Sequence, residues 1–138
     1  MHSSGLLHEA LTRSIIGAFY EVYNQLGYGF LEQVYANALE RELVARNHQV
    51  MREFRLQVWY KGETVGTCRA DMVVDEMILV ETKSTFALHG SSDRQLLNYL
   101  SAAGLDVGFI MHFGPKPRFR RLIRSDLIPV ARRRPSGS

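Results

Sequence analysis

The sequence predicts an α/β fold, in which a mixed β-sheet is flanked by helices. Three changes in the hydrophobic pattern support this prediction. Apolar residues recur at helical spacing up to about residue 47, and they alternate with polar residues over most of 50–84. A further helical segment then precedes one last apolar strand. An antiparallel three-stranded meander followed by a crossover helix and another strand makes a mixed sheet with helices on both faces.

Two helices are expected before the sheet. The first runs from about Ser4 to Gln25 and ends at Gly27, because glycine readily adopts the left-handed conformation that follows a helix. The second runs from about Leu31 to Asn47. Their apolar stripes consist of Leu7, Ala10, Leu11, Ile15, Ala18, Phe19 and Val22 in the first helix and of Val34, Ala38, Leu39 and Leu43 in the second.

The next segment has the period of β-strands. Alternation predicts a strand over Val50–Tyr60, which turns at Lys61-Gly62-Glu63 into a second strand over Thr64–Val74. Asp75-Glu76 turns that strand into a third, Met77–Ser84, whose aliphatic residues are typical of a central strand buried on both faces.

A loop over Phe86–Ser92 separates the meander from a third helix, Arg94–Ala103, for which Ser92 or Asp93 is the expected N-cap. The fourth strand is Val107–Phe113, which two prolines follow. The segment Phe119–Ile123 is expected to add a short strand at the edge of the sheet.

Size and composition limit the class of protein. At 138 residues, of which 46% are hydrophobic, the chain is expected to form one domain over 4–125 and a basic, flexible tail over 126–138. The single cysteine, Cys68, forbids an intramolecular disulfide and is interpreted as a small core residue. The sequence contains neither a secretory signal nor an apolar run long enough to cross a membrane, so we expect a soluble, cytoplasmic protein.

The net charge of +3 is unevenly distributed. From Lys116 onward the chain has eight basic residues and one acidic residue, whereas the remainder has nine basic and thirteen acidic residues. A basic end on an acidic body points to a polyanion partner, bound through the cluster at Arg118–Arg124. The last residues, Arg132–Ser138, are expected to form a solubilising tail, because their composition cannot build a core.

Two acidic residues interrupt the most apolar pair of strands. By strand alternation Glu81 and Lys83 project from one face of the third strand, while Thr82 points to the other. The turn at Asp75-Glu76 brings Asp71, on the second strand, nearly opposite Glu81.

Together Asp71, Glu81 and Lys83 form a workable hydrolytic centre for a phosphodiester. Two carboxylates held a few ångströms apart repel each other unless a cation lies between them, and their oxygen atoms suit Mg²⁺ or Mn²⁺. A nearby lysine can orient or deprotonate a metal-bound water and offset negative charge in the transition state. Each residue alone also fits a solvated strand face. Their joint position favours chemistry, since charges are rarely placed in apolar strands without a partner or a metal.

Two helical pairs are further candidates. Glu32 and Tyr35 share one face of the second helix, where Glu32 has either a metal-site role or a favourable interaction with the helix N-terminus. Gln95 and Tyr99 share a face of the third helix, where they either orient a ligand or phosphate or mark the solvent boundary. The five histidines have no metal-ligand spacing, and no phosphate loop, nucleophile elbow or Cys/His pair is present. These absences argue against a zinc site, an NTPase and an acyl hydrolase.

The segment Gly29–Tyr35 has the pattern Gly-x-x-Glu-x-x-Tyr, and it resembles the GxxExxY family of the PD-(D/E)xK nuclease superfamily. The similarity covers roughly Leu11 to Ile123. Gln95-x-x-x-Tyr99 also resembles the Gln-x-x-x-Tyr motif of the RecB-like branch. Further matching segments are Arg69-Ala70-Asp71, Val80-Glu81-Thr82-Lys83, Gln95–Leu100 and Gly108–Gly114.

The resemblance implies a restriction-endonuclease-like core and a metal-dependent phosphodiester hydrolase. The implied site has Mg²⁺ or Mn²⁺ held by Asp71, Glu81, Glu32 and the backbone carbonyl of Thr82, with Lys83 at the attacking water and Gln95 and Tyr99 beside the phosphate. Thr82 departs from the family pattern, which has an aliphatic residue at this position.

The leading hypothesis is therefore a nuclease that acts on nucleic acid, with DNA favoured over RNA. Two alternatives stay open: a nucleic-acid-binding or assembly module on the same fold without turnover, and a phosphodiesterase acting on a nucleotide-sized ligand. A domain this small is also expected to form a homodimer or to bind a partner protein.

Overall fold

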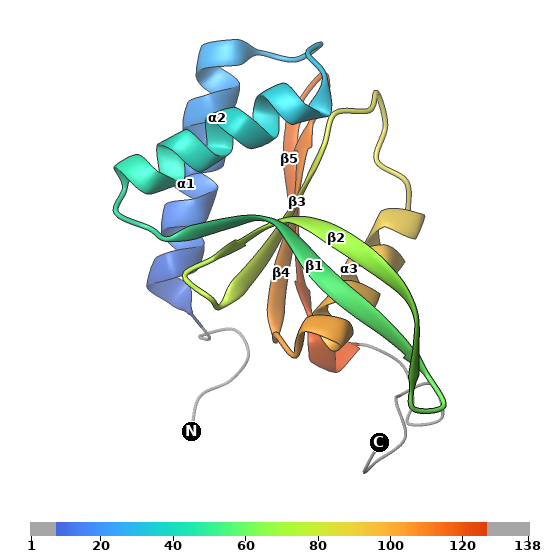
Figure 1. The fold of residues 1–138 in the computed structure, drawn as a ribbon. Coiled ribbons are helices and arrows are strands. Elements are labelled where there is room, and N and C mark those ends of the chain that lie inside the picture. Colours follow the sequence, from blue (N-terminus) through green and yellow to red (C-terminus); the bar gives the residue numbers. More distant parts are fainter. Residues whose placement is uncertain (1–7, 127–138) are drawn as a thin grey trace.

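The structure, a computed structural model, describes residues 8–126 (Figure 1). Most of the predicted tail, residues 127–138, and the predicted start of the first helix at Ser4 lie outside this range. In chain order the elements are α1 (Glu9–Leu26), α2 (Glu32–Ala45), β1 (Val50–Tyr60), β2 (Glu63–Val74), β3 (Ile78–Lys83), α3 (Ser91–Ala103), β4 (Val107–Phe113), β5 (Pro117–Ile123) and a short 3₁₀ helix, η2 (Arg124–Asp126).

The five strands form one mixed sheet in the order β1-β2-β3-β4-β5. The pair β3–β4 is parallel and is connected through α3, whereas the other three pairs are antiparallel. All residues of β3 except Lys83 are buried, which confirms the prediction of a central strand. The edge strand β5 is also confirmed, and it begins at Pro117, two residues before the predicted start.

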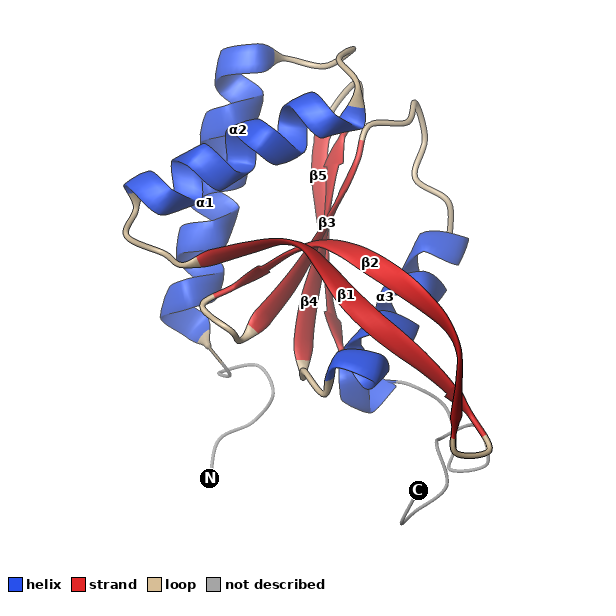
Figure 2. Ribbon diagram, in the orientation of Figure 1, coloured by secondary structure: helices blue, strands red, loops and turns tan. Residues whose placement is uncertain are grey.

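The helices cover both faces of the sheet, as Figure 2 shows, so the predicted α/β class is confirmed. The helices α1 and α2 pack on one face over a core that includes Phe19, Leu39 and Phe109. The helix α3 packs on the other face over a smaller core that includes Leu79 and Leu100. The central strands are thus buried between two helical layers.

Two helix starts differ from their predictions. The helix α1 begins at Glu9, because His8 has a left-handed φ of 56° that does not continue a helix. The helix α3 begins at Ser91 after Gly90, and no side chain caps it. The prediction of a Ser92 or Asp93 cap was therefore wrong. The Asp93 carboxylate instead pairs with the Arg120 guanidinium of β5 at 3.1 Å.

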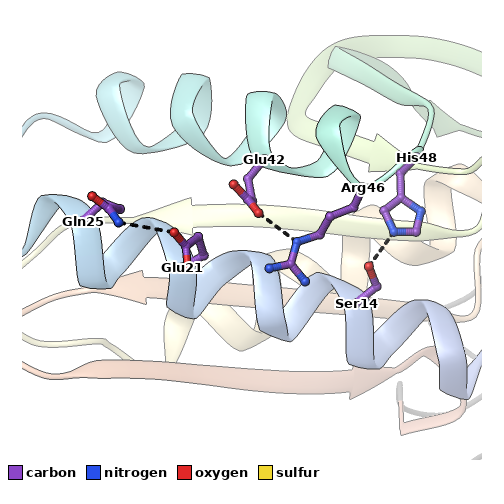
Figure 3. A network of polar contacts seen from close by, with 6 residues as sticks. All are labelled: Ser14, Glu21, Gln25, Glu42, Arg46 and His48. Atoms are coloured by element: carbon purple, nitrogen blue, oxygen red, sulfur yellow. Dashed lines mark hydrogen bonds and ion pairs between the residues drawn. The ribbon is translucent and has the colours of Figure 1, made fainter.

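Polar contacts join α1 and α2 beside their apolar contact (Figure 3). Ser14 of α1 and His48, just beyond α2, are linked by a hydrogen bond of 2.6 Å. The Arg46 guanidinium pairs with Glu42 at 2.9 Å and lies over Gly17. A Cβ atom at Gly17 would lie 2.8 Å from Arg46 Nη1, so glycine gives this side chain room to lie along α1.

The turn between β2 and β3 is tied to the end of α2. Asp75 and Glu76 both have left-handed φ values, 51° and 58°, and the Met77 N–H donates to the Val74 carbonyl at 3.0 Å, which closes the turn. The Asp75 carboxylate accepts the Gln49 amide hydrogen at 2.7 Å and contacts His48 Nδ1 at 2.7 Å. The turn predicted at Asp75-Glu76 is confirmed, and it fixes the register between β2 and β3.

The hairpin of β1 and β2 is kinked opposite Asp71. The Arg52 guanidinium contacts two α2 side chains at 2.9 and 2.8 Å, whereas Phe54, two residues later, packs into the core beneath α3. A regular strand would place both side chains on the same face. Between them Glu53 has a left-handed φ of 52°, which moves the outer half of the hairpin onto the opposite face.

Candidate functional site

The site lies where β2 and β3 diverge. Their ladder runs from Val74 opposite Ile78 to Met72 opposite Val80. At the next position the backbone N–H of Asp71 donates to Glu81 Oε2 at 2.8 Å, so a carboxylate takes the place of a ladder acceptor. This geometry confirms that Asp71 lies opposite Glu81.

The Asp71 carboxylate is held from the other strand in the same way. Its Oδ2 atom accepts the Thr82 backbone N–H at 2.6 Å and the Thr82 hydroxyl at 2.7 Å. Thr82 is 1% exposed, so both donors are fixed in the protein interior. Asp71 is therefore oriented by hydrogen bonds to β3, with its second oxygen left for other partners.

Glu81 is a buried acid, with 6% of its surface exposed. Burial, and then the neighbouring charge of Asp71, raise the pKa of Glu81 to about 8, while the Asp71 backbone N–H and the Lys83 ammonium oppose that rise. A buried carboxylate pair of this kind favours either one proton or a cation.

Glu32 reaches the same site from the first turn of α2, although it remains exposed to solvent. Partial burial raises the pKa of Glu32, Lys83 lowers it, the Asp71 charge raises it, and the Ser84 backbone amide lowers it. These influences place Glu32 within electrostatic reach of both Asp71 and Lys83.

The helix α3 adds the remaining two predicted residues. Lys83 Nζ lies 3.5 Å from Gln95 Oε1, which directs the ammonium group toward α3. The pKa of Tyr99 is raised by burial first and then by the neighbouring Cys68 thiol and the Glu81 and Asp71 carboxyls. Cys68 is only partly buried, so the interpretation of a small core residue is only partly right.

Hydrogen bonds join Asp71 with Glu81 and Lys83 with Gln95, and Glu32 and Tyr99 lie within electrostatic reach of them. Glu32 comes from α2, Asp71 from β2, Glu81 and Lys83 from β3, and Gln95 and Tyr99 from α3. Because β3 is a central strand, α2 on one face of the sheet and α3 on the other can both contribute side chains near its carboxyl end.

A family model described as the PD-(D/E)XK nuclease superfamily matches residues 9–122. The chain belongs to the PD-(D/E)XK nuclease superfamily. The crystal structure of SSO0001 is similar in fold, with a TM-score of 0.55 and 17% identity over 84% of this chain. The chain spans 59% of the length of that protein, and this likeness supports the fold alone. No curated protein matches the chain. Membership of the GxxExxY family or of the RecB-like branch stays a prediction.

In this PD-(D/E)XK protein the tyrosine of the Gly-x-x-Glu-x-x-Tyr segment has a role that the sequence analysis missed. Tyr35 is fully buried and stacks on Phe113, with ring centroids 4.3 Å apart. Its hydroxyl donates to the Gly27 carbonyl at 2.7 Å and accepts the Phe30 N–H at 3.2 Å. Tyr35 therefore holds the loop that leads into Glu32.

The glycine of the same segment is required by the backbone. Gly29 has a φ of 114°, a conformation that side chains disfavour. The sequence hinted at this conformation, because a glycine that directly precedes a predicted helix often has a positive φ. The segment Gly29–Tyr35 therefore shapes the loop before α2 and places Glu32 at the first position of that helix.

The oxygen-rich character of the site suits a hard divalent cation, because Glu32, Asp71 and Glu81 all carry carboxylates. Within residues 8–126, however, no three His, Cys, Asp or Glu side chains stand in a ready-made metal-binding arrangement. The Asp71 and Glu81 carboxylates accept hydrogen bonds from the opposite strand. No helix in the same range is long and apolar enough to span a membrane.

Proposed function

We propose that the chain is a metal-dependent phosphodiester hydrolase that acts on nucleic acid, with DNA favoured over RNA. The observation that carries this proposal is the pair of carboxylates, Asp71 and Glu81, at the fork of two central strands with Lys83 on the same strand as Glu81. Superfamily membership supports nuclease chemistry at this place.

The residues that would hold Mg²⁺ or Mn²⁺ are Asp71, Glu81 and Glu32, together with the backbone carbonyl of Thr82. Such a cation would stabilise negative charge that develops on the phosphate. Release of the Glu81 proton would leave a dicarboxylate of higher charge for the cation to bind.

The chain's own groups would then divide the remaining work. The Lys83 ammonium would contact the attacking water and the phosphate, and Gln95, whose Oε1 atom lies 3.5 Å from Lys83 Nζ, would keep that side chain directed toward the substrate. The Thr82 hydroxyl and amide would hold Asp71 in its orientation. Tyr99, which lies within electrostatic reach of both carboxylates, would donate its hydroxyl hydrogen to a phosphate oxygen.

A nuclease assay tests the proposal. Single-stranded and duplex DNA and RNA are incubated with wild type, Lys83→Ala and Asp71→Asn in Mg²⁺ or Mn²⁺. Cleavage should be lost in both variants and retained in Lys61→Ala, which removes an exposed lysine at the hairpin turn. Equal activity of wild type, Lys83→Ala and Asp71→Asn would overturn the proposal.

A second candidate is a nucleic-acid-binding or assembly module without turnover. It is favoured by the hydrogen bonds that already engage one oxygen each of Asp71 and Glu81 within the protein. In this case wild type binds DNA with an affinity that falls steeply with salt, and no divalent cation produces cleavage.

A further inference from the structure

A groove of about 620 Å³ lies near the carboxyl ends of β3 and β4. Its walls come from α1, from the loop between β3 and α3, from β4 and from β5. Figure 1 shows that loop beside the upper ends of these strands. The lining residues are Tyr20, Phe86, Ala87, Leu88, His112, Arg118, Phe119 and Arg120.

The sheet register connects this groove to the proposed catalytic lysine. Lys83 of β3 pairs with His112 of β4, and His112 pairs with Arg118 of β5. Residues paired directly across neighbouring strands present their side chains on the same face. A row of Lys83, His112 and Arg118 therefore runs from the carboxylate centre to the edge of the sheet.

The groove combines aromatic surfaces with positive charge. Phe86 is 81% exposed, and Tyr20 is 36% exposed and lies edge-on to Phe119, with ring centroids 6.3 Å apart. Arg118 is exposed and makes no ion pair or side-chain hydrogen bond with any other residue in the 8–126 range. Arg120, in contrast, forms an ion pair with Asp93 of α3.

A buried polar atom in the wall lacks a partner. His112 is 3% exposed, and its Nε2 lies 2.7 Å from the Thr85 carbonyl oxygen, which can only accept a hydrogen bond. Nε2 therefore carries the hydrogen. Nδ1 is buried and has no hydrogen-bond partner within the described residues.

We propose that this groove binds one unstacked nucleotide of a single-stranded segment, next to the proposed site of hydrolysis. Phe86 would stack on the base, and Arg118 would contact the phosphate. Duplex bases stack on one another and hide their faces, whereas single strands offer them to aromatic side chains. The volume suits a ligand the size of one nucleotide. This inference rests on the proposed function, since it names the form of nucleic acid that reaches the same centre.

Binding in a chelator tests it without turnover. Fluorescein-labelled oligothymidylate and a labelled duplex are titrated into a Lys83→Ala background by fluorescence anisotropy, with Phe86→Ala or Arg118→Ala added. Tyr60→Ala and Arg55→Ala are matched controls, because both residues are exposed and lie on the opposite edge strand.

Phe86→Ala should weaken binding of the single strand by about five- to 150-fold and leave duplex binding unchanged. Arg118→Ala should reduce the slope of log affinity against log salt by about 0.7. The two control variants should match the background.

The inference is wrong if Phe86→Ala binds the single strand as Tyr60→Ala does, or if it loses as much affinity for the duplex. If wild type cleaves no nucleic acid with any cation but Phe86→Ala still shows the selective loss, the proposed function fails and the binding groove stands.

Discussion

The backbone N–H of Asp71 donates a 2.8 Å hydrogen bond to the Glu81 carboxylate, at the position where β2 and β3 would otherwise form their next ladder bond. The two acids therefore have a structural role in addition to the proposed catalytic one, because their hydrogen bonds hold β2 and β3 together where the strands begin to separate. Substitutions at either position are best made with the amide of the same shape, so that stability and chemistry are measured separately.

The first prediction concerns the stability of the protein in a chelator. Folded Glu81 has a pKa of about 8, above the ordinary value of 4.5, so between these values the folded chain holds a proton that the unfolded chain releases. Glu81 therefore contributes stability below about pH 4.5 that is lost as pH rises through about 8. Its contribution to the free energy of unfolding should fall by up to about 1.4 kcal/mol per pH unit.

Glu81→Gln should remove most of this pH dependence, because glutamine does not titrate. Urea unfolding at a series of pH values measures it. Glu63→Gln, which changes an exposed glutamate near the hairpin turn, should keep the wild-type slope. Parallel curves for wild type and Glu81→Gln would contradict the prediction.

The second prediction concerns Thr82→Val, which removes the hydroxyl that donates to Asp71 Oδ2 at 2.7 Å but keeps the backbone donor. The free energy of unfolding should fall by about 1 kcal/mol. If Asp71 holds the metal as proposed, nuclease activity should fall by about ten- to 100-fold, as is usual when a group that orients a metal ligand is removed.

Chemical unfolding and a cleavage assay measure the two effects. The control is Thr67→Val, since that hydroxyl donates a long, exposed hydrogen bond of 3.4 Å to Gln57. Unchanged cleavage by Thr82→Val would show that the hydroxyl does not position Asp71.

The third prediction concerns Tyr35→Phe, which keeps the stacked ring and removes both loop hydrogen bonds. The Gly27 carbonyl and the Phe30 amide, both only partly shielded from solvent, lose this partner, so the protein should be destabilised by about 1 kcal/mol. Hydrogen exchange at the Phe30 amide should accelerate. The matched variant Tyr28→Phe alters an exposed tyrosine of the same loop, and equal exchange in the two variants would rule out the proposed role of Tyr35.

The fourth prediction concerns Glu76→Gly in the turn between β2 and β3. Glu76 has a φ of 58°, which glycine adopts without steric strain. The free energy of unfolding should rise by roughly 1 kcal/mol, since the relief of strain exceeds the loss of chain entropy. Glu76→Ala should not stabilise the protein, because alanine retains the Cβ atom. A thermal melt that shows equal gains in both variants would exclude this explanation.

Regular, local patterns were predictable from the sequence. The bounds of β1 and β4 match their predictions, because alternation and a continuous apolar run define them. The turn at Asp75-Glu76 and the facing of Asp71 and Glu81 followed from the same local logic. Roles assigned to individual site residues stay predictions.

Features that depend on distant partners were not predictable. Asp93 pairs with Arg120 of β5 rather than capping α3, and the cap prediction had no information about that strand. The left-handed conformation of Glu53 accompanies the change of packing face between Arg52 and Phe54, and nothing about a glutamate side chain predicts it. The buried hydroxyl of Tyr35 depends on the Gly27 carbonyl, across a loop whose shape the sequence alone did not define.

The kink at Glu53, opposite Asp71, divides the hairpin into two parts with different freedom to change. Every residue from 57 to 67 is exposed, and these outer rungs project beyond the helices in Figure 1. The inner rungs are anchored by Arg52 and by the buried end of β2. The outer hairpin can therefore lengthen or shorten by whole rungs without shifting Asp71, which makes it a natural place to graft or diversify recognition elements while the chemistry beneath stays in register.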